Sequence, residues 1–372
     1  MYLRNRLKGV SRNQIQKLID LGGVKINDHP AKASATVRRD HVLDVLLPPP
    51  PAKYLQAQPI PLHVVYEDEH FIVVNKQAGL VVHPARSHLS GTLLNALAHH
   101  FMAKAPAPAG TEAAAGSLST VGADECRPGI VHRLDKNTTG VMVVAKSDTA
   151  HWQIARQFEQ RTPLKAYLAL IHGSIDGVGG VVEAPIGKHP TIREAYAVRH
   201  DSSGKPSITL YRVRERYRGY TLVELELKTG RTHQIRVHMS YMGHPLAGDI
   251  VYGGEPIGGR ELDDPPQAAG ARHMTTFARN RQEGLKVESD AAARSDMLLA
   301  CPALHAALLR FTHPITNQQM TFTAPLHEPL ASLLRELRLR KADGPVALEG
   351  YWVRMDGGSD EATKRRSDGG EP

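Results

Sequence analysis

The chain has 372 residues, of which 41% are hydrophobic and 23% charged, so it is long enough to form two or three packed domains. It contains no run of about 18 apolar residues, which excludes a membrane-spanning helix, and its basic start does not have the pattern of a secretory signal. The net charge of +8 favours a polyanionic partner. The two cysteines, Cys126 and Cys301, are too few for a disulfide framework and form no C-x-x-C pair, so we expect a reducing, cytoplasmic location.

Residues 1–47 have the pattern of a small basic domain, with nine Lys and Arg against four Asp and Glu. Ser11 and Gln14 have the spacing of a helix capping box, and apolar residues follow at helical intervals. Gly22-Gly23 can end this helix. Short strands are then predicted at residues 24–26 and 42–47.

Four consecutive prolines, Pro48 to Pro51, predict a stiff linker over residues 48–60, followed by a larger domain over residues 61–340. Apolar and β-branched runs in this domain predict strands at residues 62–66, 71–75, 141–145, 166–172, 208–216 and 221–228. Helical spacing is found at residues 147–160, 232–242 and 326–339. Since several strands follow one another with few helices between them, the predicted fold class is α+β, built on a mixed, largely antiparallel sheet.

Two segments of the larger domain are predicted to be insertions. Residues 103–124 are rich in Ala, Pro, Gly and Ser, and residues 253–297 are polar with several glycines. The tail over residues 341–372 is mostly polar toward its end and is predicted to be disordered.

One polar segment between apolar strands is the strongest candidate for chemistry. The sequence has no Walker A motif, no G-x-S-x-G and no H-E-x-x-H, and we expect neither a metal site nor a cofactor. Residues 129–141 instead place a single carboxylate, Asp135, in a turn-forming stretch. The alternative is a turn aspartate that only binds backbone amides.

The segment His132-Arg133-Leu134-Asp135, followed by Thr139-Gly140, is similar to the signature of the RluA-type pseudouridine synthases. Further stretches resemble motifs of this family in the same order, and the resemblance covers about residues 61–325 apart from the insertions. These stretches are Ile72–Leu80 with Val82-His83-Pro84, Lys165–Leu170, Thr229–His238 with Gly243–Leu246, and Leu304–Ala306 with Phe311–Pro314.

The basic front end resembles the α-L RNA-binding module that precedes the catalytic domain in the large-subunit branch of the family. Its first helix is expected to be short, because the capping box begins about ten residues into the chain. Within this module, Arg12, Lys17 and Lys25 are predicted to contact RNA. The resemblance thus implies an α-L module followed by a pseudouridine synthase domain.

The resemblance implies that the chain isomerises uridine to pseudouridine without a cofactor. A carboxylate stabilises the positive charge that develops on a sugar during glycosidic bond cleavage, and Asp135 is the predicted catalytic residue. Family resemblance assigns Arg236 as its ion-pair partner, the alternative being a phosphate contact. Arg231 is predicted to contact an RNA phosphate or to be a solvated charge.

Two further roles come from the same resemblance. Arg133 is predicted to fill the space that a flipped-out uridine leaves, although an ordinary phosphate contact is the alternative. Tyr167 is predicted to stack on the flipped base and to be a candidate base for the proton on carbon 5, the alternative being a core aromatic. Because tyrosine has a reference pKa near 10, that second role would require activation by its surroundings.

The sequence therefore predicts an RNA pseudouridine synthase that acts on large-subunit ribosomal RNA as a cytoplasmic monomer with no obligate protein partner. Transfer RNA is the second candidate substrate. A non-catalytic RNA-binding protein for ribosome assembly is a competing hypothesis, but Asp135, Tyr167 and Arg236 are all present. A glycoside hydrolase would need a second carboxylate opposite the first, and the His132–Asp135 segment offers none nearby.

Overall fold

The computed structural model describes residues 2–6, 12–46, 55–84, 89–104, 118–119, 127–259, 262 and 297–340. The chain divides into two compact units, Met1–Tyr54 and Leu55–Pro372. Most of the two predicted insertions, the tetraproline and the whole tail over residues 341–372 lie outside the described residues. Residues 253–259, at the start of the second predicted insertion, are described and include the strand β13 (Ile257–Gly258).

The N-terminal unit packs two short helices with a three-stranded sheet of order β2-β1-β3. Its elements are α1 (Tyr2–Arg6), α2 (Arg12–Asp20), β1 (Val24–Ile26), β2 (His29–Pro30) and β3 (Leu43–Val45). The predicted helix and strands are present, although Ser11 of the capping box lies outside the described residues. Gly22 follows α2 with φ +73°, a conformation that glycine adopts without a steric penalty. Asn27 and Asp28, both at positive φ, form the hairpin turn between β1 and β2.

The large unit is built on a nine-stranded sheet in which β4-β5-β6-β15-β7-β12-β11-β8 are neighbours and β16 pairs with β15. Its strands are β4 (Val64–Glu67), β5 (Phe71–Lys76), β6 (Thr139–Ala145), β7 (Leu164–His172), β8 (Gly179–Glu183), β11 (Ile208–Tyr217), β12 (Tyr220–Leu227), β15 (Leu304–Thr312) and β16 (Gln319–Thr323). Every neighbouring pair is antiparallel except β6 and β15. The sheet is thus mixed and largely antiparallel, as the sequence predicts.

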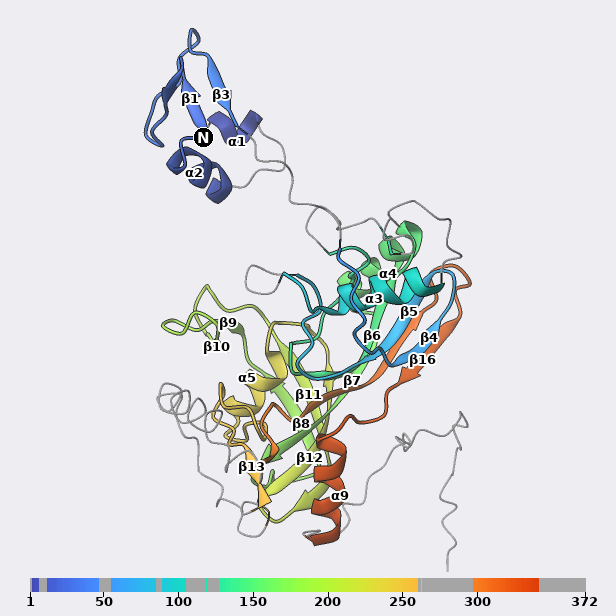
Figure 1. Cartoon of the computed structure of the whole chain (residues 1–372). Coiled ribbons are helices and arrows are strands. Elements are labelled where there is room, and N and C mark those ends of the chain that lie inside the picture. The colour runs from blue at the N-terminus through green and yellow to red at the C-terminus, as the bar shows by residue number, and fades with distance from the viewer. Residues whose placement is uncertain are drawn as a thin grey trace, which may run out of the picture. The chain divides into compact units, whose positions relative to one another are not determined.

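In the part of the large unit that the structure describes, helices and small two-stranded ribbons lie around this sheet (Figure 1). They are α3 (Leu93–Lys104), α4 (Asp148–Gln160), α5 (Gln234–Tyr241) and α9 (Leu330–Arg340), with β9 (Ile186–Lys188) pairing with β10 (Tyr196–Val198) and β13 with β14 (Met297–Leu299). The helix α4 contacts β6 and β15, α5 contacts β10 and β11, and α9 contacts β14. In the described part of the chain, none of the helices combines the length and apolar character needed to cross a membrane.

The core explains why the strands could be found from the sequence. All residues of β5 and β6 are buried, because helices and neighbouring strands cover both faces of these apolar runs. Ser147 caps α4 by accepting a hydrogen bond from the Ala150 amide, which is where the predicted helix begins. The helix α3 was not predicted, although its Leu93, Leu94 and Leu97 are fully buried.

The parallel junction between β6 and β15 fixes the start of β6. His305 pairs in register with Thr139 and binds its hydroxyl through Nδ1 at 2.8 Å, while Ala306 pairs with Gly140. Gly140 has φ +113°, and a Cβ there would lie 2.2 Å from the Ala306 carbonyl oxygen. Glycine is therefore required at this position. The loop that precedes β6, which contains Asp135, is consequently held to the centre of the sheet.

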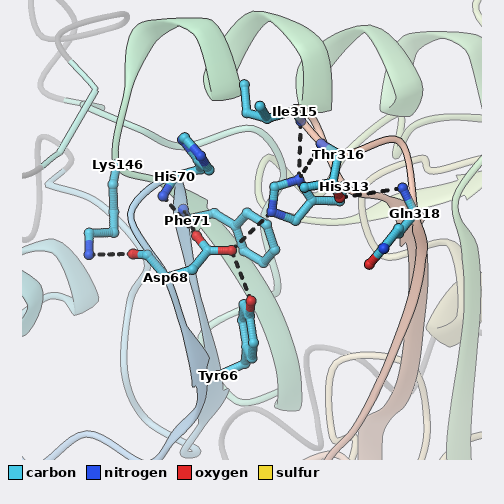
Figure 2. Close-up of polar contacts among 9 residues, drawn as sticks. All are labelled: Tyr66, Asp68, His70, Phe71, Lys146, His313, Ile315, Thr316 and Gln318. Carbon is cyan, nitrogen blue, oxygen red and sulfur yellow. Dashed lines mark hydrogen bonds and ion pairs between the residues drawn. The ribbon is translucent and has the colours of Figure 1, made fainter.

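The other end of β5 and β6 is held by a half-buried carboxylate, Asp68 (Figure 2). Its Oδ1 accepts hydrogen bonds from the backbone amides of His70 and Phe71 at 2.7 and 2.8 Å. Its Oδ2 accepts from the Tyr66 hydroxyl at 3.0 Å and from Nε2 of His313 at 3.1 Å. Asp68 therefore ties the β4–β5 turn to the end of β15.

The tautomer of His313 follows from its other contacts. Its Nδ1 accepts the backbone amides of Ile315 and Thr316, both at 3.1 Å, so the ring proton lies on Nε2 and points at Asp68 (Figure 2). Lys146, just after β6, adds a 2.6 Å hydrogen bond to the Asp68 carbonyl. Burial alone would raise the pKa of Asp68, but the hydrogen bonds from Phe71, His70, Tyr66 and His313 outweigh it and lower that pKa.

We expect Asp68→Asn to lower the free energy of unfolding by about 1–3 kcal/mol at neutral pH, because charge-assisted hydrogen bonds become neutral ones. The folded-state pKa of Asp68 lies below 3.8, so its contribution is present above pH 3.8 and is lost as the pH falls below it. Urea unfolding of both proteins at several pH values measures this. A stability difference that stays constant down to pH 2–3 would contradict the assignment.

Candidate active site

The loop before β6 places Asp135 at the surface of the large unit, four residues before the first residue of β6. The Thr138 amide donates to the Asp135 carbonyl at 3.1 Å, closing a turn, and the neighbouring Leu134 is buried in the core. The Asp135 side chain keeps 26% of its surface exposed. Among the described residues, none donates a hydrogen bond to its carboxylate. The carboxylate is therefore held by its backbone and open to a ligand.

Lys76, the last residue of β5, supports this loop by hydrogen bonds from the protein interior. Its side chain is 1% exposed, and its ammonium group donates to the carbonyls of Gln77, Leu80 and Lys136 at 3.0, 2.9 and 3.0 Å. These three acceptors match the three protons of the ammonium. Burial lowers the pKa of Lys76 to about 7, and the negative charge of Asp135 opposes that shift. Lys76 is thus a structural support of the Asp135 loop.

The helix α5 carries two sets of side chains with different tasks. Gln234 donates to the Ile208 carbonyl and the Thr209 hydroxyl, both at 3.0 Å, and His238 binds the same hydroxyl at 2.8 Å. These two residues lie one turn apart, so they anchor one face of α5 on β11. Arg236, between them in sequence, projects from a different face toward Asp135.

Arg236 lies between two carboxylates. Its Nε and Nη2 donate to Oδ2 and Oδ1 of Asp249 at 2.7 and 2.8 Å, while its Nη1 lies 3.7 Å from Oδ2 of Asp135. The Asp249 side chain is fully buried, and the guanidinium carbon lies 4.8 Å from the centre of the Tyr252 ring. Burial opposes the charge of Arg236, but Asp249 and Asp135 outweigh it and raise the pKa of the guanidinium.

The structure therefore brings Arg236 and Asp135 within ion-pair distance, as the family resemblance predicts. The bidentate contact of Arg236, however, is made with Asp249. Sequence reasoning missed Asp249 and Tyr252. A signal was present in the stretch Gly248-Asp249 to Tyr252-Gly253. Both glycines have positive φ, and the amides of Tyr252 and Gly254 donate to the Asp249 carbonyl, so this is a tight turn that points a carboxylate inward.

His233, the residue directly before α5, also lies close to Asp135. Its Nε2 lies 3.8 Å from Oδ2 of Asp135, and its Nδ1 lies 2.7 Å from the Tyr252 hydroxyl. Its backbone is left-handed, at φ 57° and ψ 20°, and its side chain does not cap α5. The predicted helix over residues 232–242 therefore begins later, at Gln234. Such a conformation costs a non-glycine residue about 1–2 kcal/mol and is concentrated at functional sites.

Tyr167 lies in β7, in register with Ala306 of β15 and Leu225 of β12, and is 9% exposed. Burial raises the pKa of its phenol, and the negative charge of Asp135 raises it further. These surroundings do not activate the hydroxyl as a base. The aromatic ring of Tyr167, rather than its hydroxyl, is therefore suited to a functional contact, which would be stacking.

The predicted RNA contacts fall at different places. Arg133 is exposed, and no described residue hydrogen-bonds to it or forms an ion pair with it. Arg231 precedes α5, half-buried, with its Nε 3.3 Å from the Pro206 carbonyl. Lys25 is exposed on β1, whereas the side chains of Arg12 and Lys17 lie outside the described residues. Arg133 is thus the arginine nearest Asp135 in sequence that is free to meet a ligand.

Two histidines near the loop, His132 and His83, differ in their contacts. His132 stacks on Phe158 at 4.4 Å and accepts the Val143 amide at 3.1 Å, which identifies it as structural. His83 is buried, and no described residue forms a hydrogen bond with its Nδ1. Burial, followed by the charges of Arg127 and Arg133, lowers the pKa of His83 to about 4. In the described residues, no group of three or more His, Cys, Asp or Glu has the geometry to hold a metal ion.

Comparisons with protein families and relatives identify the family of the chain. The family model described as "RNA pseudouridylate synthase" matches residues 70–241, and the model described as "S4 domain" matches residues 1–43. A Bacillus subtilis protein named "Uncharacterized RNA pseudouridine synthase YlyB" is 38% identical over 328 residues, covering 88% of this chain and 90% of the relative.

Two further relatives are named "Ribosomal large subunit pseudouridine synthase D". The protein from Nitrosomonas europaea is 44% identical, covering 76% of this chain and 67% of its own. The protein from Haemophilus influenzae is 37% identical, covering 88% of this chain and 87% of its own. The solved structure titled "Human RNA Pseudouridylate Synthase Domain Containing 1" has a TM-score of 0.50 at 24% identity, covering 78% of this chain and 91% of that one, which shows a shared fold.

We expect Arg236→Ala to lower the free energy of unfolding by about 3–5 kcal/mol, because it leaves Asp249 buried and unpaired. The double variant Arg236→Met with Asp249→Leu removes both charges and should regain most of that stability. Asp135→Ala, which removes an exposed contact at 3.7 Å, is the matched control and should change stability little. Chemical denaturation of the three variants checks the order. Equal stability of Arg236→Ala and the wild type would contradict the buried pairing.

Proposed function

The chain belongs to the RNA pseudouridylate synthase family and is an isomerase of uridines in RNA, and we propose that its substrate is large-subunit ribosomal RNA. The names of the relatives from Nitrosomonas europaea and Haemophilus influenzae support this substrate class. The basic N-terminal unit supports it too, since positive charge on a small module favours binding to a phosphate backbone. The observation that carries the proposal is the open Asp135 carboxylate beside buried Arg236.

The reaction breaks the bond between N1 of uracil and C1′ of ribose, and forms a bond between C5 and C1′. The proton on C5 is lost and N1 gains one, so atoms balance with no external group and no change in oxidation state. Cleavage develops positive charge on the sugar, and Asp135 is our proposed catalytic residue for stabilising it. Arg236 places a positive charge 3.7 Å from the Asp135 carboxylate, while its own position is set by Asp249.

Access to a stacked uridine requires that the base leave the RNA helix. We assign Arg133 to the vacated space, because its planar guanidinium can stack where a base was. Its exposed position two residues before Asp135, with no hydrogen bond or ion pair to a described residue, supports this role. Tyr167 would stack on the flipped uracil, and its raised pKa favours stacking over proton transfer.

A glycoside hydrolase would need a protonated acid facing the carboxylate. Among the described residues, Asp249 is a second carboxylate that shares Arg236 with Asp135, but its side chain is fully buried and both of its oxygens accept hydrogen bonds from Arg236. It is therefore engaged as a partner of Arg236 and cannot reach a leaving group. This arrangement favours isomerisation over hydrolysis.

We further propose that the enzyme works as a monomer in the cytoplasm, where ribosomal RNA is modified. Arg231 in the large unit, and Arg12, Lys17 and Lys25 in the N-terminal unit, are proposed phosphate contacts.

We expect Asp135→Asn to abolish pseudouridine formation while RNA affinity and thermal stability stay near wild type, because only an open charge is removed. Unmodified large-subunit ribosomal RNA is incubated with each protein and pseudouridines are mapped by carbodiimide treatment and primer extension. Turnover above a few per cent of wild type in the variant would contradict the catalytic role of Asp135. Modification of transfer RNA alone by the wild type would overturn the proposed substrate.

Deleting residues 1–54 should weaken RNA binding and flatten its salt dependence, because phosphate contacts are removed. Each lost contact should reduce the slope of log affinity against log salt by about 0.7–0.9. Filter binding or fluorescence anisotropy at several salt concentrations measures the slope for the full chain and for the deletion variant, with circular dichroism to check folding. An unchanged slope would mean that this unit makes no ionic contact with RNA.

A further inference from the structure

The ring of His233 bridges Asp135 and a buried tyrosine. Its Nε2 lies 3.8 Å from Oδ2 of Asp135, and its Nδ1 lies 2.7 Å from the hydroxyl of Tyr252. Edge-on contacts with Tyr196 and Tyr252, both with ring centres 5.6 Å away, fix the plane of the imidazole. The ring is therefore held in one orientation toward the catalytic loop.

The hydrogen bonds of Tyr252 set the tautomer of His233. The Tyr252 oxygen accepts the backbone amide of Tyr196 at 3.0 Å, and the residue is 2% exposed. A buried hydroxyl donates its proton in a hydrogen bond, and Nδ1 of His233 is the acceptor within reach of the Tyr252 hydroxyl. Nδ1 therefore accepts, and the neutral ring carries its proton on Nε2, facing Asp135.

The backbone conformation of His233 also indicates a functional role for this residue. The residue is left-handed at the N-terminus of α5, where Ser, Thr, Asp or Asn ordinarily caps the helix, and its side chain makes no capping hydrogen bond. The left-handed turn directs the ring toward Asp135 and Tyr252. A strained backbone that performs no capping is an observation that points to function.

Building on the proposed function, we propose that His233 is a positioning residue for Asp135. Its Nε2–H and Nη1 of Arg236 both make their closest approach to the same oxygen, Oδ2. When RNA closes the site, these two donors hold Oδ2 and leave Oδ1 to face the reacting uridine. Catalytic hydrogen bonds that are long in a free enzyme shorten in its complex with substrate.

The ring must be neutral to act in this way. The charged groups that influence it are Asp135, Arg236, Asp249 and Arg133, and its packed neighbours Tyr196 and Tyr252 are uncharged phenols. Burial lowers the pKa of His233 from 6.5, Asp135 and Asp249 oppose this, and Arg236 and Arg133 add to it. At a pH below the folded value Nδ1 gains a proton and can no longer accept from Tyr252, so the ring loses the contact that sets its orientation toward Asp135.

The test compares His233→Asn with Tyr252→Phe in the full chain. Asparagine tolerates the left-handed backbone but is too short to reach Asp135. Phenylalanine keeps the ring beside Arg236 and removes only the hydroxyl that sets the tautomer. We measure single-turnover pseudouridine formation at saturating ribosomal RNA from pH 5 to 9, together with RNA affinity and thermal melting.

For His233→Asn we expect a rate about 10- to 100-fold below wild type, with unchanged RNA affinity, since a misplaced reacting group costs about this much. Tyr252→Phe should lose less. The wild-type rate should fall at acid pH, and His233→Asn should remove that acid limb. A variant rate equal to wild type, or a lower rate with an unchanged pH profile, would overturn the inference. A wild type that forms no pseudouridine in any RNA would instead refute the proposed function itself.

Discussion

One buried guanidinium organises the site. Arg236 is 8% exposed, and a cation with so little water around it needs partners that stay close. The fork of Arg236 is occupied by Asp249, which is held by the turn over residues 246–254, while α5 is anchored on β11 by Gln234 and His238. The positions of the helix, the turn and the arginine are therefore interdependent. Asp135 lies beside Nη1, the guanidinium nitrogen that does not bind Asp249.

This division of contacts has a consequence for the reactivity of Asp135. A carboxylate in a bidentate pair with arginine has both oxygens engaged and little freedom to approach a substrate. Because Asp249 takes that bidentate contact, the nearest arginine nitrogen stays 3.7 Å from Asp135, which keeps the benefit of the positive charge without a direct hydrogen bond. Lys76 holds the loop through its backbone, so the side chain remains open.

The elements that could be predicted from the sequence are those that depend on a local pattern of residues. The apolar runs of β5 and β6 are strands because they are wholly buried, and Ser147 caps the helix that its spacing predicts. The partner of Arg236 could not be found in this way, because Asp249 reaches it across 13 residues through a turn whose geometry rests on positive-φ glycines. The start of α5 was misplaced for a related reason, since helical spacing does not reveal a left-handed His233.

The environment of Asp135 also bears on the proton that leaves carbon 5. Tyr167 keeps its phenol proton, since burial and Asp135 both raise its pKa. In the tautomer set by Tyr252, His233 presents a proton to the site, and the ammonium of Lys76 is engaged by three carbonyls. Compared with these three groups, Asp135 is the one whose side chain has an available lone pair. This favours a mechanism in which the carboxylate that we propose stabilises the sugar also accepts the proton, directly or through water.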